Sequence, residues 1–185
     1  NSCACALRNV RTWLITASSW SGSFPLINAN GDRNSVKRSF NNAANWSSWE
    51  QYTRTAFAML EHELGNGWVT KLQLDHKING YHALMGSIQG DEPRADGTAH
   101  ITSGKYTGET VSDSADLYAS GPFSLGGREH ELVVGGSIGI SDWNGKGYWN
   151  LAPNLVDFNT WHGHAPQPDW GAPQQYIDDT IRQTG

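Results

Sequence analysis

The chain has 185 residues, of which 37% are hydrophobic and 17% charged, and a formal net charge of -5. These values fit one folded domain and exclude a disordered chain, and the acidic balance argues against nucleic acid as the main partner. The 21 glycines and 9 tryptophans, together with few charges, indicate β structure with long polar loops. No apolar stretch approaches the roughly 20 residues of a membrane-spanning helix. A β-barrel stays possible, because it carries its apolar surface on alternate residues.

The beginning of the chain has neither an initiator methionine nor a signal segment, and its last residues resemble a strand, so we expect a piece of a longer protein. Cys3 and Cys5 are separated by one residue, and we expect free thiols or non-native sequence there. A bridge would be strained, and two ligands alone make an incomplete metal site. Residues 1–21 lack clean alternation, which leaves their strand assignment open. Residues 21–48, rich in Asn and Gly, predict a long loop.

Alternation of apolar and polar residues predicts a set of strands in the middle of the chain. The clearest covers residues 68–81, and residues 129–143 repeat its pattern. A further strand is predicted at 109–120. Residues 51–64 alternate less cleanly and contain good helix formers. The turn at residues 65–67, Gly-Asn-Gly, nevertheless favours a hairpin between 51–64 and 68–81.

The connections between these strands alternate in length. Short turns are predicted at 65–67 and around 121–128, and long loops at about 82–106 and 145–174. The long loops therefore fall at one side of the sheet. Short periplasmic turns and long extracellular loops are typical of outer-membrane barrels, and the strands exceed the ~5 to 6 residues usual in soluble proteins.

Several blocks of sequence then resemble a known family. They are RSFNNAANWSSWE at 38–50, HKINGY at 76–81, KYTGET at 105–110, SADLYASGPF at 114–123, GREHELVVGG at 127–136, KGYW at 146–149 and PDWG at 168–171. In this order they resemble the barrel of TonB-dependent ferric-siderophore receptors, with the closest likeness to the ferripyoverdine and ferric-coprogen receptor group. The resemblance covers about residues 22–185, and the first twenty residues depart from it.

The resemblance implies a fold and a function for the parent protein. The fold is all-β, with antiparallel up-and-down strands that form part of a barrel of about 22 strands in the bacterial outer membrane. The function is uptake of ferric siderophores, energised by TonB through an N-terminal plug domain. We expect the plug and the remaining barrel to lie outside this chain, with 22–185 as partial barrel and 1–21 as a divergent start. The implied partners are the ferric siderophore, TonB and outer-membrane lipid; no cofactor is bound directly.

Aromatic side chains near the loop-side rim are the candidate ligand contacts. The iron of a ferric siderophore is already saturated, so a receptor reads the outside of the chelate with aromatic planes and a few polar groups. The candidates are Trp46, Trp49, Tyr81, Trp143, Tyr148, Trp149, Trp161 and Trp170. The alternative for each is a place in the interfacial girdle or in loop packing. Trp68, beside a short turn, is predicted to belong to the periplasmic girdle and to make no ligand contact.

Other chemistries have weaker support in the sequence. His162 and His164 form a pair that transition metals can use, but a Gly- and Pro-rich loop favours solvated histidines, and we predict no metal site. No Gly-x-Ser-x-Gly, phosphate-loop or His-Glu-x-x-His motif is present, so neither an enzyme nor a catalytic residue is predicted. The alternative function is a secreted, Trp-rich carbohydrate-binding or glycosidase-like β domain.

Overall fold

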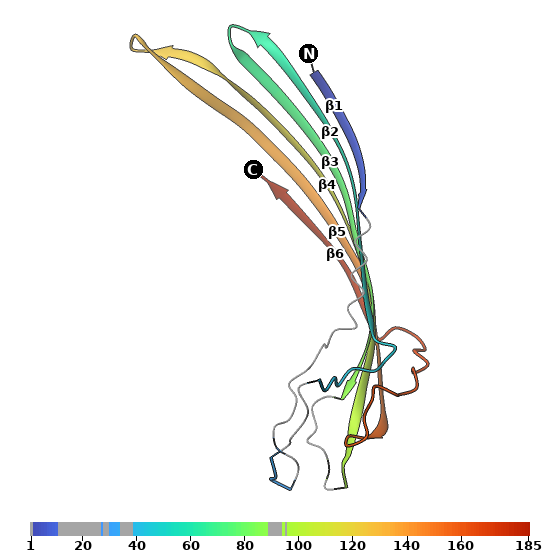
Figure 1. Ribbon diagram of the computed structural model, residues 1–185. Helices are drawn as coiled ribbons and strands as arrows, with labels where there is room; N and C mark the ends of the chain where they lie inside the picture. Colours follow the sequence, from blue (N-terminus) through green and yellow to red (C-terminus); the bar gives the residue numbers. More distant parts are fainter. Residues whose placement is uncertain (1, 11–26, 28–29, 34–38, 89–93, 95) are drawn as a thin grey trace.

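A computed structural model describes residues 2–10, 27, 30–33, 39–88, 94 and 96–185. These residues form one antiparallel sheet in which every strand pairs with its neighbours in the chain, in the order β1-β2-β3-β4-β5-β6. The strands are β1 (Ser2–Val10), β2 (Ser48–Gly65), β3 (Trp68–Ile88), β4 (Thr98–Leu125), β5 (Arg128–Asp157) and β6 (Gln175–Thr184). The sheet is strongly arched, with two tight turns at one end and the longer connections at the other (Figure 1). The all-β fold predicted from the sequence is confirmed.

The two faces of the sheet differ in character, because residues directly opposite each other in an antiparallel ladder share a face. Leu72 pairs with Leu60 and Leu117, and the row of Leu74 contains Ala58, Ala115 and Ile138. We call this side, including its loop-side continuation, the apolar face; Leu117 and Ile138 on it are 57% and 61% exposed. The opposite side, the polar face, contains Glu61, Lys71, Gln73, Asp75, Ser114 and Asp116. On it Lys71 Nζ lies 2.8 Å from Glu61 Oε2.

Both tight turns use backbone conformations with positive φ. The turn between β2 and β3 has Asn66 at 52° and Gly67 at 78°, and that between β4 and β5 has Gly126 at 61° and Gly127 at 75°. Two successive residues of this kind suit the right-handed twist of a hairpin, and Asn and Gly tolerate them best. The predicted turn at 65–67 is confirmed. The second is tighter than the predicted 121–128, because Leu125 already pairs with Arg128.

The strands extend further toward the loop side than the sequence predicted. The loop expected at 82–106 is limited to 89–97, and the one expected at 145–174 is limited to 158–174. The added strand segments contain several glycines, which are unfavourable in strands and suggested loops. Residues 2–10 also form a strand, β1, whose register places Ser2 opposite Glu61 and Val10 opposite Thr53. Within the described residues, no helix is long and apolar enough to cross a membrane.

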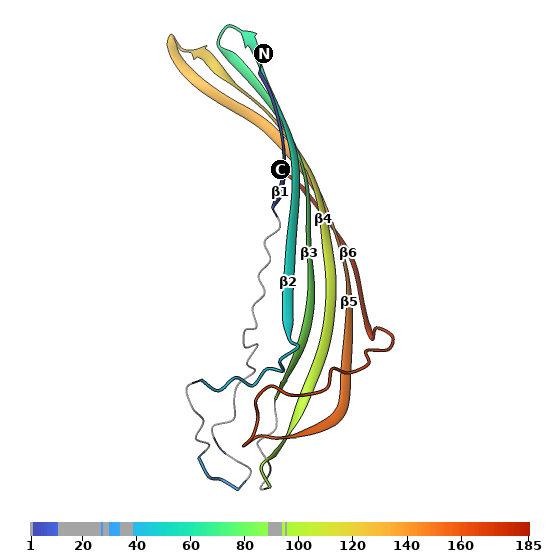
Figure 2. The same ribbon diagram turned by 45° about the vertical axis from the view of Figure 1, so that its right-hand side comes forward.

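The buried core of the described residues lies at the loop end of the sheet. It contains Ala44, Ile88, Ala99, Ile101, Phe158 and Trp161. Ile88 and Ile101 are cross-strand partners on the apolar face. Segments 40–47 and 158–165 therefore cover this face at the strand ends, and backbone hydrogen bonds from Ala44 N to Gly86 O (2.7 Å) and from Asn45 N to Gly163 O (2.8 Å) hold them there. Figure 2 shows both segments running across the loop end.

Candidate ligand-binding site

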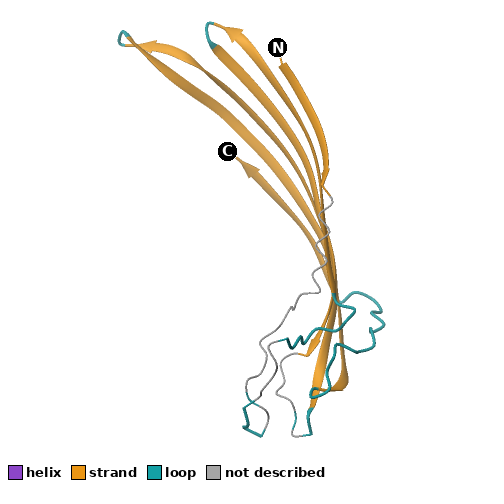
Figure 3. Ribbon diagram, in the orientation of Figure 1, coloured by secondary structure: helices purple, strands orange, loops and turns teal. Residues whose placement is uncertain are grey.

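The loop end of the polar face carries a cluster of aromatic rings. Trp49, Ala83 and Tyr106 are register partners and form one row across β2, β3 and β4. Tyr81 lies in the adjacent row toward the turns, and Trp149 in the adjacent row toward the loops. We call Trp49, Tyr81, Tyr106 and Trp149 the aromatic surface. Figure 3 shows that the long strands continue without a break into this end of the sheet.

Direct contacts fix the rings of the aromatic surface. The rings of Trp49 and Tyr81 stack with centroids 5.9 Å apart and an interplanar angle of 21°. Tyr106 and Trp149 meet edge to face at 6.2 Å and 75°. Trp149 Nε1–H also donates a hydrogen bond of 2.6 Å to the Tyr106 hydroxyl. Aromatic pairs of this kind contribute about 0.5 to 1.5 kcal/mol beyond their buried area, so the rings are held in place before any ligand arrives.

Glycines beneath the rings give the aromatic surface its flat base. Gly108 lies opposite Tyr81, and the Tyr81 ring lies over it. A Cβ atom on Gly104 would lie 2.7 Å from Tyr106 Cε2, closer than real contacts allow. Only glycine therefore lets these tyrosines lie flat against the sheet. Ala83, between Trp49 and Tyr106, is completely buried.

The loop before β6 anchors the strand that carries Trp149. Gln174 Oε1 accepts a hydrogen bond of 2.8 Å from the Trp149 backbone N–H, and Gln174 Nε2 donates one of 3.1 Å to the Trp149 carbonyl oxygen. The Gln174 backbone N–H donates to the Gly147 carbonyl oxygen at 2.9 Å. These hydrogen bonds continue the pairing with β5 for one residue before the start of β6, and they orient Trp149.

Trp143 lies on the polar face but outside this cluster. It pairs with Thr110 on β4, in the same row as Asn79 and Thr53, and is 37% exposed. In that row Thr53 Oγ1 donates a hydrogen bond of 2.8 Å to Asn79 Oδ1. Trp143 therefore stands beside polar groups, one row nearer the turns than Tyr81.

The other four aromatic candidates lie on the opposite side of the sheet. Tyr148 is on the apolar face, with Lys105 Nζ 4.9 Å from its ring centroid. The Trp46 ring lies over Gly86 on that face, and its Nε1–H donates a hydrogen bond of 3.0 Å to the Ala165 carbonyl oxygen. The Trp46 and Trp170 rings meet edge to face with centroids 6.1 Å apart. Trp161 is 7% exposed, and its Nε1–H donates to the Asn41 carbonyl oxygen at 2.9 Å. The rings of Trp46, Trp161 and Trp170 pack the loops onto the strand ends.

Tyr106 was missed because the sequence placed it in a loop. Once β4 is known to begin at Thr98, alternation from the polar residues of that strand assigns Tyr106 to the polar face. Trp68 begins β3 beside the first tight turn, and its ring lies over Gly121 at the end distant from the aromatic surface. Its role in a girdle stays a prediction. No group of three or more His, Cys, Asp or Glu side chains that could hold a metal ion occurs among the described residues.

One ionisable group in the described part of the β3–β4 connection has a perturbed pKa. Asp96 Oδ1 accepts hydrogen bonds from the Thr98 backbone N–H at 2.9 Å and from the Thr98 hydroxyl at 2.7 Å. The backbone N–H is the largest cause that lowers the pKa of the Asp96 carboxyl, and the Thr98 hydroxyl is the next. The ionised carboxylate thus caps the start of β4.

Taken together, these features define a class of protein. An antiparallel meander of long strands, with one apolar and one polar face, tight turns at one end and long connections at the other, is the wall of an outer-membrane-type β-barrel. In such a wall the apolar face meets lipid and the polar face meets the barrel interior. The aromatic surface therefore lines the interior near the loop-side mouth.

Comparison with known proteins identifies the particular family. The chain is 61% identical over 171 residues to the ferripyoverdine receptor of Pseudomonas aeruginosa. The matched region covers 91% of this chain and 21% of that receptor. It is 33% identical over 147 residues to the ferric-pyoverdine BN7/BN8 receptor of Pseudomonas putida, covering 75% of this chain and 18% of the relative. No protein-family model matches the chain.

Solved structures agree with these relatives. A crystal structure of the ferripyoverdine receptor of the outer membrane of Pseudomonas aeruginosa, bound to ferripyoverdine, matches with a TM-score of 0.82 and 62% identity, covering 89% of this chain and 22% of that one. These matches confirm the resemblance found in the sequence motifs: the chain is an outer-membrane barrel segment of the TonB-dependent ferripyoverdine-receptor family. It spans about a fifth of the length of the curated relatives it matches.

Proposed function

We propose that the protein containing this segment takes up a ferric siderophore across the outer membrane, energised by TonB through a plug domain, and catalyses no reaction. The observation that carries the proposal is the aromatic surface, fixed on the interior face at the loop-side mouth. Ferripyoverdine is the first ligand to test, because the relatives named above are ferripyoverdine receptors. The secreted carbohydrate-binding alternative has no support among them. Within the chain, we assign residues 22–185 to the partial barrel and 1–21 to a divergent start.

The proposed ligand contacts are the interior-facing aromatic residues only. They are Trp49, Tyr81, Trp143 and Trp149 from the sequence-based set, with Tyr106 added. Trp46, Tyr148, Trp161 and Trp170 are left out, because they lie on the opposite side of the sheet and a ligand in the barrel interior does not reach that side. Half-buried aromatic rings suit a ligand site, because such sites combine aromatic and apolar walls with a few polar groups.

Two neighbouring residues provide a matched test. Trp149 and Tyr148 are consecutive in β5 and face opposite sides of the sheet. In the full-length receptor, Trp149→Ala should weaken binding of iron-55-labelled ferripyoverdine by about 30-fold, the effect of losing about 80 Å² of apolar contact at ~25 cal/mol per Å². Tyr148→Ala should leave the affinity within about twofold of the wild type, since its ring lies on the face opposite the aromatic surface. Equal losses in both variants, or none in Trp149→Ala, would contradict the assignment.

A further inference from the structure

The Tyr106 hydroxyl is a hydrogen-bond donor that the aromatic surface leaves unused. Its oxygen accepts the 2.6 Å hydrogen bond from Trp149 Nε1–H. A phenol keeps one proton of its own to donate, and an indole N–H is a donor only, so Trp149 does not take that proton. Among the described residues, no hydrogen bond from the Tyr106 hydroxyl to an acceptor is present. The proton is therefore available to a ligand.

The side chains around the hydroxyl offer it no strong acceptor. The Tyr106 ring lies over Gly104, so the hydroxyl stands one row nearer the loops than its own Cα. In that row Gly104 is opposite Met85 on β3 and Trp149 on β5. A thioether is a weak acceptor and an indole N–H is none. The Gln175 amide lies in the row of the Tyr106 Cα, which the ring leaves. An acceptor thus reaches the proton from the barrel interior.

Charged side chains of the polar face lie too far from the hydroxyl to act on a ligand bound there. Asp179 on β6 lies two rows, and Lys77 on β3 three rows, nearer the turns than Tyr106. Rows on one face are about 6.6 Å apart, so both charges lie beyond the ~8 Å screening length of physiological salt. The hydroxyl is a neutral donor, and it recognises an acceptor by hydrogen bonding instead of by an ion pair.

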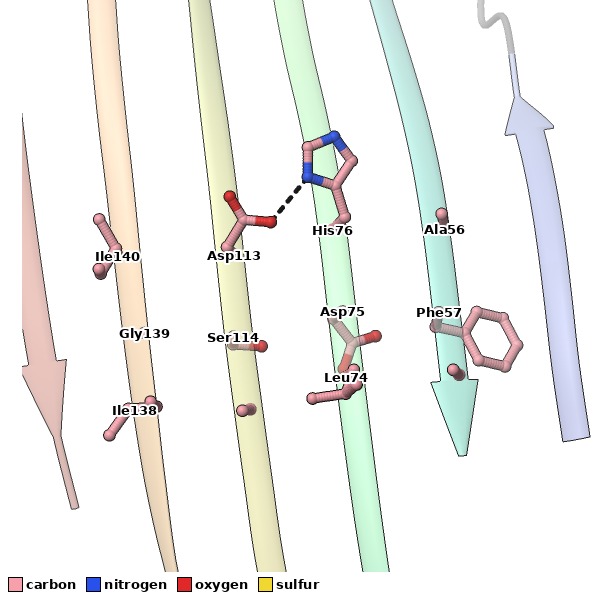
Figure 4. A pocket seen from close by; sticks show the side chains of 12 residues that line it. Ala56, Phe57, Leu74, Asp75, His76, Asp113, Ser114, Ile138, Gly139 and Ile140 are labelled. Carbon is pink, nitrogen blue, oxygen red and sulfur yellow. Dashed lines mark hydrogen bonds and ion pairs between the residues drawn. The ribbon is translucent and has the colours of Figure 1, made fainter. Parts of the chain in front are cut away.

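Other titratable groups face the opposite side of the sheet. Lys105 precedes Tyr106 in β4, and its Nζ lies 4.9 Å from the ring centroid of Tyr148 on the apolar face. His76 and Asp113 also lie on that face, with His76 Nδ1 2.7 Å from Asp113 Oδ1 (Figure 4). The sheet separates these groups from the interior. The acceptor for the Tyr106 proton therefore comes from the ligand itself.

The strongest acceptors on a ferric siderophore are the oxygens that bind the iron. They have lost their protons on metal binding and carry negative charge, and hydrogen bonds to ionised acceptors are about twice as strong as neutral ones. The hydrogen bond from Trp149 polarises the Tyr106 O–H and strengthens it as a donor. In the metal-free siderophore the same oxygens keep their protons, so they are neutral and weaker acceptors.

We propose that the Tyr106 hydroxyl donates a hydrogen bond to an iron-bound, negatively charged oxygen of the siderophore and thereby distinguishes the iron-loaded chelate from the metal-free siderophore. The inference rests on the proposed function, in which the aromatic surface binds the ligand, and it adds the group that reads the metal. Trp149 then has two roles: its ring contacts the ligand, and its Nε1–H holds the hydroxyl in the donating orientation. The site favours chelates whose iron-binding oxygens are exposed at their surface.

Removal of the hydroxyl tests the proposal. Full-length receptor and its Tyr106→Phe variant are titrated by calorimetry with ferripyoverdine and with metal-free pyoverdine. The variant keeps a ring over Gly104, so its affinity for ferripyoverdine should fall about 30-fold, the effect of losing a hydrogen bond to a charged acceptor. Its affinity for metal-free pyoverdine should stay within about threefold of the wild type. Equal losses for the two forms overturn the proposal, because they describe a disturbed Trp149 ring. An unchanged affinity for ferripyoverdine overturns it as well.

Trp149→Ala separates this inference from the proposed function. It removes a ring that contacts either form of the siderophore, so both affinities should fall. If Trp149→Ala weakens both forms and Tyr106→Phe weakens neither, the role of the hydroxyl is refuted and the ligand site stands. If neither variant changes either affinity, the proposed function is refuted with it.

A fluorinated tyrosine removes the proton and leaves the oxygen in place. Trifluorotyrosine, whose phenol ionises near neutral pH, replaces Tyr106 in the full-length receptor by amber suppression. Its phenolate still accepts from Trp149 Nε1–H, so the rings keep their contacts, but it has no proton to donate and repels an anionic oxygen. The affinity for ferripyoverdine, divided by that of the wild type at the same pH, should fall about tenfold as the pH rises through the pKa of the fluorinated phenol. A ratio that stays constant or rises overturns the proposal.

Discussion

The glycine beneath Tyr106 provides a sharp test of the aromatic surface, because a single methyl group there perturbs two rings. In Gly104→Ala the new Cβ would lie 2.7 Å from Tyr106 Cε2 and 2.8 Å from its hydroxyl oxygen. The neighbour is a ring at the end of a side chain, so the ring must rotate away from the strand. That rotation removes the hydroxyl from Trp149 Nε1, which lies 2.6 Å from it in the native arrangement.

The size of the effect follows from the two interactions that this rotation breaks. A hydrogen bond contributes a net ~1 kcal/mol and an edge-to-face aromatic pair about another 1 kcal/mol. If both interactions hold the rings in their binding arrangement, ligand affinity falls by about 2 kcal/mol, or about 30-fold. Gly139→Ala is the matched control: it lies in β5 of the same sheet, and its nearest neighbours would be 3.9 Å from the new Cβ, an ordinary contact distance.

The assay is a titration of full-length receptor with ferripyoverdine, followed by quenching of tryptophan fluorescence, with urea unfolding of each variant in parallel. Gly104→Ala should lose affinity while keeping a cooperative unfolding transition, and Gly139→Ala should behave like the wild type in both measurements. Wild-type affinity in Gly104→Ala would refute the reasoning. So would an equal loss of affinity in Gly139→Ala, because the effect would then belong to any added methyl group.

Three further predictions concern other parts of the sheet. Lys71→Met should leave the free energy of unfolding unchanged within the error of the measurement, because solvent screens its partly exposed ion pair with Glu61; a clear loss of stability in urea unfolding of the receptor in vesicles would contradict this. Gly127→Ala should lower the same free energy by about 1 kcal/mol and Gly127→Asn by less, since the φ of 75° suits Gly and Asn; equal values for the two variants would contradict a turn requirement. The Asp96 cap should be fully formed above the ordinary pKa of a carboxyl and should be lost as the pH falls through its lowered folded-state pKa. Hydrogen exchange at the Thr98 amide should accordingly accelerate, after correction for intrinsic rates, only in acid, and Asp96→Ala should exchange fast at every pH.

The sequence predicted the turn-side half of the sheet well. Along residues 68–81 one face meets lipid and the other meets polar groups, so alternation is strong there. At the loop end the pattern fails, because glycines such as Gly104 and Gly108 occupy positions that rings from neighbouring residues cover. Glycine-rich stretches then resemble loops, and Tyr106 was placed in one.

The aromatic candidates show a second limit of sequence reasoning. The opposite orientations of Tyr148 and Trp149 follow from alternation once β5 is known to reach Asp157. The placement of Trp46 does not, because it depends on a hydrogen bond to Ala165, 119 positions along the chain. No local pattern encodes such a contact, so loop tryptophans could be proposed as ligand contacts but not assigned to a side of the sheet.

The two tight turns have a consequence for how barrels of this kind change in size. Each hairpin, β2–β3 and β4–β5, leaves the loop side and returns to it through two residues. A hairpin can therefore be duplicated or deleted as a unit without reversing the direction of any other strand or moving a loop to the wrong side of the membrane. Adding or removing a single strand would reverse the direction of every strand that follows it. Genetic gain and loss in this architecture should proceed by pairs of strands, and the long connections are the natural points of recombination.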